Sequence, residues 1–355
     1  MIFSFSETIQ TWYNLHKRQL PWRDTKNPYN IWLSEIILQQ TRVNQGLPYY
    51  RKFFEAFPTI QDFANAEENH ILNLWQGLGY YSRGRNMLKC AKKIVSDYGG
   101  VFPISKESLT KLPGIGDYTA SAIASFAFDQ PNAVLDGNVY RVLSRYFGID
   151  SPINVSSSQK LFKSLAQDQL DLKNPANYNQ AIMEFGALQC TPSNPDCKSC
   201  PLAEGCVALR ENKVNQLPVK IKSKPKRIRH FNYFVFVNKS KVLISQRSKK
   251  GIWQGLYQFP LIETEKSYSR EEIKPLLKTT YCLDETSVNK RFTFKHLLSH
   301  QTIYADFWIV PVSDFGFNLN SDIFEVELKA LGADYAMPVL IHKFLGSGVM
   351  EEICL

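Results

Sequence analysis

The chain has 355 residues, 44% of them hydrophobic, and carries a formal net charge of +9 at pH 7. This length favours two domains over one, and the basic balance indicates an anionic partner such as nucleic acid or an acidic membrane surface. No apolar run approaches the length that spans a bilayer, which argues against an integral membrane protein. The first residues, MIFSFSETIQTWYNLHKRQ, lack the basic start of a signal peptide. We therefore expect a cytoplasmic, reducing location.

The N-terminal 212 residues are expected to be helical. Apolar residues recur there with helical spacing, at residues 9–15, 31–38, 71–78, 88–95, 109–112 and 178–188. Prolines and Asn-Pro pairs separate these segments, as they do between helices. The pattern predicts one helical domain over residues 1–212.

Glu35 is the only ionisable residue in the apolar segment 30–41, NIWLSEIILQQT. In a helix it shares a face with three apolar side chains, those of Ile31, Trp32 and Leu38. Burial among them disfavours the charged carboxylate, so we predict a raised pKa for Glu35. A carboxyl that stays protonated near neutral pH is what a general acid needs. The alternative is a buried glutamate that pairs with an arginine such as Arg23, or that reaches solvent.

Residues 75–85, WQGLGYYSRGR, interleave glycines with tyrosines and arginines. They are not a dinucleotide-binding fingerprint, because Ser82 replaces the third glycine of that pattern. Aromatic and arginine side chains on a glycine-rich loop suit stacking on bases and pairing with phosphates. The segment is therefore predicted to read a nucleic-acid strand. The alternative is a helix end with buried tyrosines.

Residues 112–142 contain a turn, PGIG, followed by a small-residue segment that is predicted to be helical over 117–128. Gly114 and Gly116 relieve the turn of side-chain clashes, and the bare N–H groups of such a hairpin can hold a DNA phosphate. Asp136 follows an apolar run and lies at the start of a second predicted helix near residue 137. The alternatives are a plain helix–helix connection and a helix N-cap for Asp136.

Glu35 and Asp136 are a candidate catalytic pair. Cleavage of an N-glycosidic bond builds oxocarbenium character at the sugar, as in glycoside hydrolysis. The reaction needs one protonated group at the leaving base and one anion beside the sugar. A glutamate among apolar neighbours and an aspartate held at a helix start could supply these two roles.

Four of the seven cysteines lie in one short stretch with the spacing C-x6-C-x2-C-x5-C, namely Cys190, Cys197, Cys200 and Cys206. In a cytoplasmic protein such a group indicates metal or iron–sulfur ligation rather than disulfides. Zinc ribbons usually present two close pairs of cysteines, and only one close pair is present here. Structural zinc is therefore the weaker alternative.

Beyond the cysteines the chain is first rich in basic residues, and the spacing of its apolar residues then changes. Residues 213–229 carry seven basic residues and no acid, which predicts an extended, exposed linker that either contacts a phosphate backbone or is simply solvated. Residues 230–355 are expected to form an α+β domain. Its predicted strands lie at 230–237, 242–246 and 302–310, and its predicted helices at 271–278 and 338–345.

These patterns together resemble one family of DNA repair enzymes. The hairpin followed by Asp136 is similar to the motif of the helix-hairpin-helix superfamily of base-excision DNA glycosylases, and LPWR with WLSEIILQQTRV resembles its adenine DNA glycosylase (MutY) family. The cysteine spacing matches the 4Fe–4S loop of endonuclease III and its relatives. The resemblance implies a multi-domain protein. It would have an all-α helix-hairpin-helix glycosylase domain with an iron–sulfur cluster loop (residues 190–206), plus an α+β MutT/Nudix-like C-terminal domain that recognises 8-oxoguanine.

The resemblance also implies catalytic roles. Glu35 would protonate adenine N7 and later activate water, while Asp136 would stabilise the sugar cation and Asn138 would orient Asp136. Glycosylases of this superfamily that also cut the strand carry a lysine where this chain has Tyr118. A tyrosine cannot form the Schiff base of that step, so we expect base removal without an efficient lyase step.

Substrate contacts follow from the same resemblance. The adenine pocket would be completed by Tyr118 and Arg23, and its walls would be formed by Leu20 and Trp22. A base inside a duplex is unreachable until it is flipped out, and Gln40 would wedge into the duplex for this purpose. The base opposite adenine would be touched by Thr41, Leu78 and Tyr80.

The C-terminal domain departs from its hydrolytic relatives. After Gly255 the glutamate of the Nudix hydrolase signature is missing, and residues 270–275 read REEIKP instead of the magnesium-binding acid cluster. We therefore expect no nucleotide hydrolysis. The Phe-Ser-His loop that reads 8-oxoguanine in the family is Leu298-Ser299-His300 here. Ser299 and His300 are candidate contacts to that base, and the alternative is a surface turn with a capping serine.

The sequence thus predicts a monofunctional adenine DNA glycosylase of base excision repair. Its expected partner is double-stranded DNA with adenine opposite 8-oxoguanine or guanine, and its expected cofactor is a 4Fe–4S cluster. We expect a monomer that is cytoplasmic, nucleoid-associated and not bound to membranes. Rival interpretations are a mismatch thymine glycosylase, an endonuclease III-like glycosylase and lyase, and a non-catalytic binder of damaged DNA.

Overall fold

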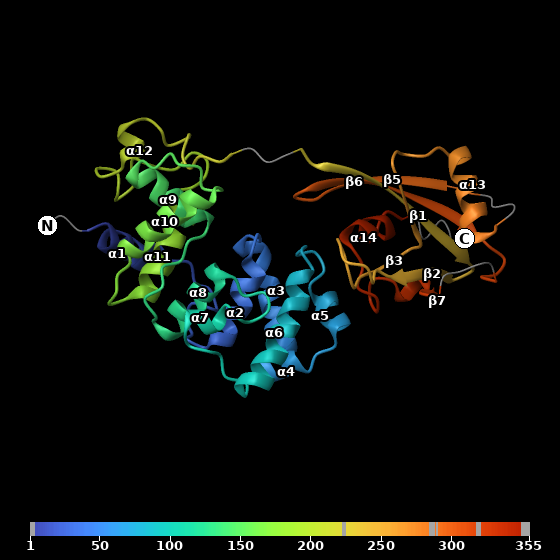
Figure 1. Cartoon of the computed structure of the whole chain (residues 1–355), viewed down its shortest axis with the longest axis horizontal. Helices are drawn as coiled ribbons and strands as arrows, with labels where there is room; N and C mark the ends of the chain where they lie inside the picture. The colour runs from blue at the N-terminus through green and yellow to red at the C-terminus, as the bar shows by residue number, and fades with distance from the viewer. Residues whose placement is uncertain (1–3, 222–224, 284–287, 289, 317–320, 349–355) are drawn as a thin grey trace. The chain divides into compact units, whose positions relative to one another are not determined.

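The computed structural model of the chain describes residues 4–221, 225–283, 288, 290–316 and 321–348. The chain divides into two compact units, Met1–Asn65 with Asn86–Ser223 and Ala66–Arg85 with Lys224–Leu355. The first is the helical unit, and the second, which is built on a β-sheet, is the sheet unit (Figure 1). Within the described ranges, no helix combines the length and the apolar character that crossing a membrane requires.

The helical unit confirms most of the predicted helices. Helix α5 (Glu68–Leu74) belongs to the sheet unit, and it ends at Leu74 rather than at the predicted residue 78, before the glycines that follow. Helix α6 (Ser82–Tyr98) begins in the sheet unit and continues into the helical unit. The remaining helices of this unit are α1 (Phe5–His16), α2 (Pro28–Leu38), α3 (Val43–Ala56), α4 (Ile60–Ala64), α7 (Lys106–Leu109), α8 (Asp117–Phe128), α9 (Gly137–Phe147), α10 (Ser156–Asp168), α11 (Pro175–Leu188) and α12 (Val207–Arg210).

Local sequence signals fix where the helices around the pocket begin. Helix α2 starts with Asn27 as N-cap and Pro28 in its first turn, a pair that suits a helix start. The hairpin before α8 needs Gly114, whose φ is 77° and whose added Cβ would lie 2.8 Å from Asn86 Cβ. Helix α8 has the predicted bounds, 117–128. Helix α9 starts at Gly137 with Asp136 as its N-cap.

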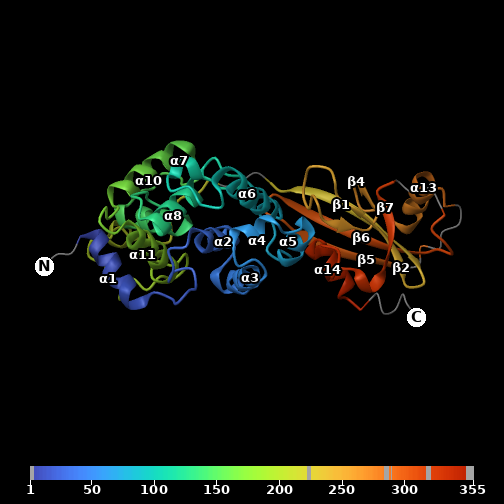
Figure 2. The ribbon, with the colours of Figure 1, turned by 90° about the horizontal axis from the view of Figure 1, so that it is seen from below.

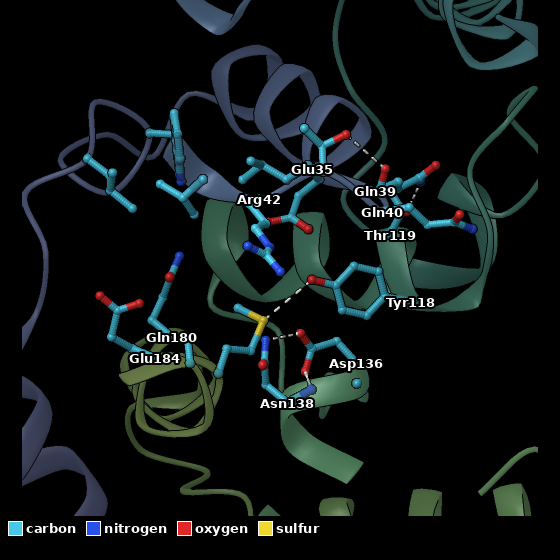
Figure 3. Close-up of a pocket in the computed structure, with 18 of the residues that line it drawn as sticks. Glu35, Gln39, Gln40, Arg42, Tyr118, Thr119, Asp136, Asn138, Gln180 and Glu184 are labelled. Carbon is cyan, nitrogen blue, oxygen red and sulfur yellow. Dashed lines mark hydrogen bonds between the residues drawn. The ribbon is translucent and has the colours of Figure 1, made fainter. Parts of the chain in front are cut away.

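Packing then brings four chain segments to one place. Helix α2 packs against α3 and α8, and α11 packs against α1, α8 and α9. Ile31, Trp32 and Ile37 of α2 are buried in the core. Glu35 and Leu38 of α2, the hairpin before α8, the start of α9 and one side of α11 surround a pocket (Figure 3).

The predicted linker is wrong in part. Leu217 is buried, its carbonyl accepts from Arg145 Nε at 3.1 Å, and Val219 O accepts from Ile153 N at 3.0 Å. Residues around Leu217 thus pack on the helical unit. At the other end, Arg227 is already the first residue of strand β1. The basic composition of residues 213–229 predicted that the segment is exposed. Composition does not show whether a single apolar residue among many lysines, here Leu217, is buried.

The sheet unit has the predicted α+β organisation. Its strand order is β3-β2-β1-β6-β5, with β4 paired to β1 and β7 paired to β2. The pairing of β1 with β6 is parallel, and the other pairings are antiparallel. The strands are β1 (Arg227–Asn238), β2 (Lys241–Gln246), β3 (Tyr257–Gln258), β4 (Leu261–Thr264), β5 (Lys290–Leu297), β6 (Gln301–Pro311) and β7 (Ile323–Glu327).

The two faces of this sheet are covered by different helices (Figure 2). Alternation along β1 and β6 sends Phe234 and Trp308 into a core with α13 (Arg270–Tyr281). On the other face, Phe307 stacks on Phe344 of α14 (Val339–Leu345), with ring centroids 4.2 Å apart. Glu272, from the altered Nudix signature, forms a capping box with Ser269 at the start of α13.

Residues 66–85 belong to the sheet unit, although they lie in the middle of the helical sequence. Asn69 Nδ2 donates to Asp334 O at 2.8 Å, and Asn73 Nδ2 donates to Ala333 O at 3.3 Å. The guanidinium of Arg85 donates to Gln254 O. These bonds attach the predicted strand-reading segment to loops of the sheet.

The two arginines of this segment have partners within the sheet unit. Arg83 lies over the Trp75 ring, 4.9 Å from its centroid, and donates to Leu78 O and Gly79 O. Arg85 donates to a backbone carbonyl. Both guanidinium groups are therefore used inside the protein.

Candidate active site

One pocket in the helical unit brings together most of the residues that the sequence singled out. It encloses about 1110 Å³, which is ample for a nucleobase and its sugar, since pockets for small ligands span about 300–1,000 Å³. Its lining includes every predicted catalytic residue and both hairpin glycines. The predicted residues found there are Leu20, Trp22, Arg23, Glu35, Gln40, Thr41, Gly114, Gly116, Tyr118, Asp136 and Asn138.

Glu35 reaches this pocket from α2 and is only 8% exposed. Burial is the main reason that its pKa rises to about 7, and the nearby Asp136 raises the pKa further. The Tyr118 hydroxyl and Arg23 act in the opposite direction. The prediction of a raised pKa is confirmed, and the cause is the expected loss of hydration.

The alternative in which Arg23 neutralises Glu35 is not what the structure shows. Both terminal nitrogens of Arg23 bind Glu184 instead, NH1 to Oε1 at 2.9 Å and NH2 to Oε2 at 2.7 Å. Arg23 Nε also donates to Gln180 Oε1 at 3.3 Å. Arg23 thus binds another carboxylate, and it opposes the burial-driven rise in the pKa of Glu35 through its charge.

Asp136 is both a helix cap and a pocket residue. Its Oδ1 accepts from Asn138 N at 2.9 Å and from Val139 N at 2.8 Å, and its Oδ2 accepts from Asn138 Nδ2 at 2.8 Å. Burial raises the pKa of Asp136, while these hydrogen bonds favour the anion and oppose the rise. Asp136 is therefore the N-cap of α9 and a pocket residue at once, and the capping hydrogen bonds fix the direction of its carboxylate.

Tyr118 is the second residue of α8 and points into the pocket (Figure 3). Its hydroxyl donates to Met183 Sδ at 3.4 Å. Burial, followed by the neighbouring Glu35 and Asp136, raises the pKa of Tyr118 well above its ordinary value. The tyrosine is therefore a neutral hydrogen-bond donor between two carboxyl groups.

The residues at the pocket mouth have a backbone suited to a wedge. Gln40 follows α2, is exposed and has a left-handed backbone with φ of 56°. Such a conformation is uncommon for a residue other than glycine and often accompanies function. Thr41 lies beside it, and its hydroxyl donates to Gln39 O at 3.4 Å. Leu20 and Trp22 are buried residues of the same lining.

Four predicted contact residues lie in the sheet unit and are not part of this pocket. Leu78 is buried, while Tyr80 is 44% exposed with a left-handed backbone, φ 47°. Ser299 and His300 are exposed in the turn between β5 and β6, and Ser299 Oγ lies 3.1 Å from His300 Nδ1. The Tyr80 side chain is thus accessible to a DNA base, whereas the Leu78 side chain is part of the hydrophobic core.

The four clustered cysteines are free thiols, and they lie near one another. Burial raises the pKa of Cys197, Cys200 and Cys206, and each is raised further by its neighbouring cysteines. Within the described residues, no three ligands are placed to hold a single metal ion. Four thiols gathered in one loop provide the donor set that an iron–sulfur cluster uses.

Helix α9 connects this loop to the pocket. Arg145 NH1 donates to Cys190 Sγ at 3.4 Å and to Thr191 O at 2.7 Å. Arg141 Nε donates to Cys190 O at 2.7 Å, and its NH2 donates to Asn138 Oδ1 at 2.8 Å. The amide that holds Asp136 is therefore itself held by an arginine that binds the cysteine loop.

Comparison with known proteins adds a family to this geometry. Residues 33–167 match the HhH-GPD superfamily of base excision DNA repair proteins, and residues 232–347 match the NUDIX domain. The adenine DNA glycosylase of Buchnera aphidicola subsp. Baizongia pistaciae is 38% identical over 312 residues, which cover 86% of this chain and 86% of that protein. The chain belongs to the adenine DNA glycosylase family. The predicted family, fold class and enzyme class, a DNA N-glycosylase, are thereby confirmed.

Solved structures place the fold among DNA glycosylases. A thermostable thymine-DNA glycosylase is 31% identical, with a TM-score of 0.54, and the match covers 58% of this chain and 95% of that one. An endonuclease III trapped on DNA shares the fold with a TM-score of 0.51 at 21% identity, over 58% of this chain and 94% of that one. The adenine family match extends further along this chain than either.

Sequence analysis missed several residues of the pocket, above all Glu184. The same criterion that selected Glu35 would have found it, because Glu184 is the only acid or base in the helix PANYNQAIMEFGAL. Its two arginine partners could not be foreseen, since they precede it by more than 150 residues. Arg18, Gln180 and Met183 also line the pocket and carried no recognisable signal.

Proposed function

We propose that the chain is a monofunctional adenine DNA glycosylase, which hydrolyses the N-glycosidic bond of adenine mispaired with 8-oxoguanine or guanine in duplex DNA. The observation that carries this proposal is the meeting of Glu35 and Asp136, far apart in sequence, in one pocket large enough for a nucleoside. Membership of the adenine DNA glycosylase family supports the choice of base.

The two carboxyl groups divide the chemistry between them. Glu35, with a pKa of about 7, gives its proton to adenine N7. The bond between sugar C1′ and adenine N9 then breaks, and its electron pair leaves with the base. Asp136 stabilises the positive charge that develops on the sugar. Water adds to C1′ and returns a proton to Glu35, which leaves an abasic site and restores the enzyme.

The reaction stops at the abasic site because Tyr118 cannot form an imine. Its hydroxyl, between Glu35 and Asp136, has a strongly raised pKa and remains protonated. Borohydride trapping on cleaved DNA tests this part of the proposal. We expect no trapped complex, whereas trapping as efficient as that of a lyase would contradict it.

The opposite base is read by residues outside the pocket as well as at its mouth. Gln40 wedges into the duplex, and the base opposite adenine is contacted by Thr41, Leu78 and Tyr80. Ser299 and His300 contact 8-oxoguanine. Their exposure and that of Tyr80 support this assignment. Ser299→Ala is expected to slow excision opposite 8-oxoguanine more than excision opposite guanine, and an equal loss on both would refute the role.

The cysteine loop holds a 4Fe–4S cluster in this proposal, with Cys190, Cys197, Cys200 and Cys206 as ligands. When bound, the cluster would cross-link the loop and could transfer single electrons. Arg145 and Arg141 fix the loop to α9. Analysis of the purified protein should find about four iron and four acid-labile sulfide per chain, whereas zinc without sulfide would contradict the assignment.

The protein acts on DNA as a monomer associated with the nucleoid, and its net charge of +9 suits a polyanionic partner. A single-turnover assay tests the proposed substrate. It compares duplexes with adenine opposite 8-oxoguanine, adenine opposite guanine, thymine opposite guanine and an oxidised pyrimidine. Release of adenine from the first two is expected, and release of only thymine or the oxidised pyrimidine would overturn the proposal.

A further inference from the structure

Three charged side chains form a cluster on the α11 side of the pocket. The Glu184 carboxylate accepts from Arg18 in three places, its backbone N at 3.0 Å, its Nε at 2.8 Å and its NH2 at 2.6 Å. Arg23 adds two further bonds, at 2.9 and 2.7 Å. Five hydrogen bonds thus converge on one carboxylate, and two of its partners are planar guanidinium groups that suit such forked contacts.

The state of this carboxylate is set by its partners. The Glu184 side chain is 1% exposed, compared with 33% for Arg18 and 9% for Arg23. Burial alone favours the protonated form, but the hydrogen bonds from both arginines overcome it and lower the pKa of Glu184 to about 2. Two guanidinium groups and one carboxylate therefore carry a net charge of +1 at pH 7.

Glu184 on α11 and Glu35 on α2 line the same pocket from different elements (Figure 3). Arg18 and Arg23 belong to its lining as well. Burial raises the pKa of Glu35, and the charge of Arg23 is near enough to oppose the rise. Helix α2, which carries Glu35, packs against α3 and α8. Tyr118 on α8 and Asp136 at the start of α9 also act on Glu35. The same pocket is lined by three further charged residues, Arg42, Asp117 and Arg141.

We infer that Glu184 is a positioning residue of the active site, which clamps the guanidinium groups of Arg18 and Arg23 to one wall and holds the charge that faces Glu35 at one positive unit. Without Glu184, two uncompensated cations would favour the ionised form of Glu35. Fewer molecules would then hold the proton that the leaving base must receive. The inference rests on the proposed function in taking Glu35 as the general acid.

Charge-changing variants test the role directly. Glu184→Gln preserves the shape of the side chain but raises the net charge of the cluster by one unit. We expect the pH at which single-turnover excision falls to half its maximum to drop by about one unit. Rates would be measured between pH 5.5 and 9. Glu184→Asp retains the charge, and its half-maximal pH should stay near that of the unaltered chain, whatever the change in rate.

Arg18 provides a compensating change. Arg18→Gln combined with Glu184→Gln returns the cluster to its original net charge, so the half-maximal pH should return toward the original value. Arg18→Gln alone lowers the charge of the cluster and should move that pH upward. Because the Arg18 side chain is 33% exposed, this variant tests the charge argument even if Glu184→Gln does not fold. A residue that only stabilised the fold would produce neither the opposite shifts nor the compensation.

The outcomes separate this inference from the proposed function. Glu35→Gln is assayed in parallel, and substantial excision by that variant would overturn the acid role itself. If Glu35→Gln is inactive and the half-maximal pH of Glu184→Gln is unchanged, the inference about Glu184 is wrong while the proposed function stands. A downward shift in Arg18→Gln alone would also overturn it.

Discussion

Glu35 on α2 and Glu184 on α11 are glutamates on two walls of one pocket, with exposed fractions of 8% and 1%. Burial raises the pKa of Glu35 to about 7. Glu184 is buried at least as deeply, yet hydrogen bonds from Arg18 and Arg23 lower its pKa to about 2 against the effect of burial. The position of two guanidinium groups, rather than the degree of burial, separates the proposed proton donor from the carboxylate that stays ionised.

This difference matters because the proposed glycosylase reaction needs one protonated and one ionised carboxyl group within a single site. Enzymes of this kind assign roles to carboxyl groups through their environments. Arg23 lies near both glutamates but bonds only to Glu184 among them.

The largest expected effect is on excision by Glu35→Gln. The amide cannot donate an acidic proton, so the single-turnover rate on adenine opposite 8-oxoguanine should fall by about 10³-fold, within the usual range for loss of a general acid. Duplex binding in a gel-shift assay should persist. Glu55→Gln, an exposed change on α3 with the same loss of charge, is the matched control and should excise normally.

Asp136→Asn should reduce excision by about 10²-fold, because the anion that stabilises the sugar cation is lost. The helix should survive, since asparagine caps a helix about as well as aspartate does. Circular dichroism and single-turnover rates on the same preparation check the two halves of this prediction. A variant that keeps its fold and excises at the normal rate would remove Asp136 from the chemistry.

Glu184→Ala should lower the free energy of unfolding at pH 7 by about 3 kcal/mol, because it leaves two arginines without their carboxylate. Since the folded-state pKa of Glu184 lies below its ordinary value of 4.5, this contribution is present above pH 4.5 and is lost as the pH falls toward 2. Urea unfolding at pH 7 and pH 2.5 measures the effect. Glu35→Gln should change the free energy of unfolding in the opposite direction. This variant should be as stable as the unaltered chain at pH 7, or more so.

The smallest effect concerns pH. In the proposed mechanism Glu35 must be protonated to act, and its pKa in the folded chain is about 7. The rate of excision should therefore be level below pH 7 and fall about tenfold for each unit above it. A rate that rises through this range would show that the ionised form of Glu35 limits the reaction, and would contradict the assignment of Glu35 as the acid.

Local patterns predicted the parts of the site whose causes lie nearby in sequence. Glu35 stood out because its helix is otherwise apolar, and Asp136 because it precedes a helix after an apolar run. The bounds of α8 follow from the glycine turn before it and the small residues within it. In each case the physical cause lies within a few residues along the chain.

Partners distant in sequence could not be predicted in the same way. The choice of Glu184 over Glu35 by Arg23 depends on how α11 packs. Arg83 is a residue type that suits phosphate binding, yet its guanidinium group donates to the carbonyl oxygens of Leu78 and Gly79 in its own loop. Leu217 is buried although lysines dominate its surroundings in the sequence.

The attachment of residues 66–85 to the sheet unit has a practical consequence. Removing everything after the basic stretch would strip the acceptors from Asn69 and Asn73 and the carbonyl from Arg85, all three of which precede the hairpin. A shortened protein would therefore carry a damaged segment inside its remaining half. The C-terminal part is not a detachable module, and single substitutions at Ser299 or His300 will separate its influence on base choice from its support of the N-terminal chain.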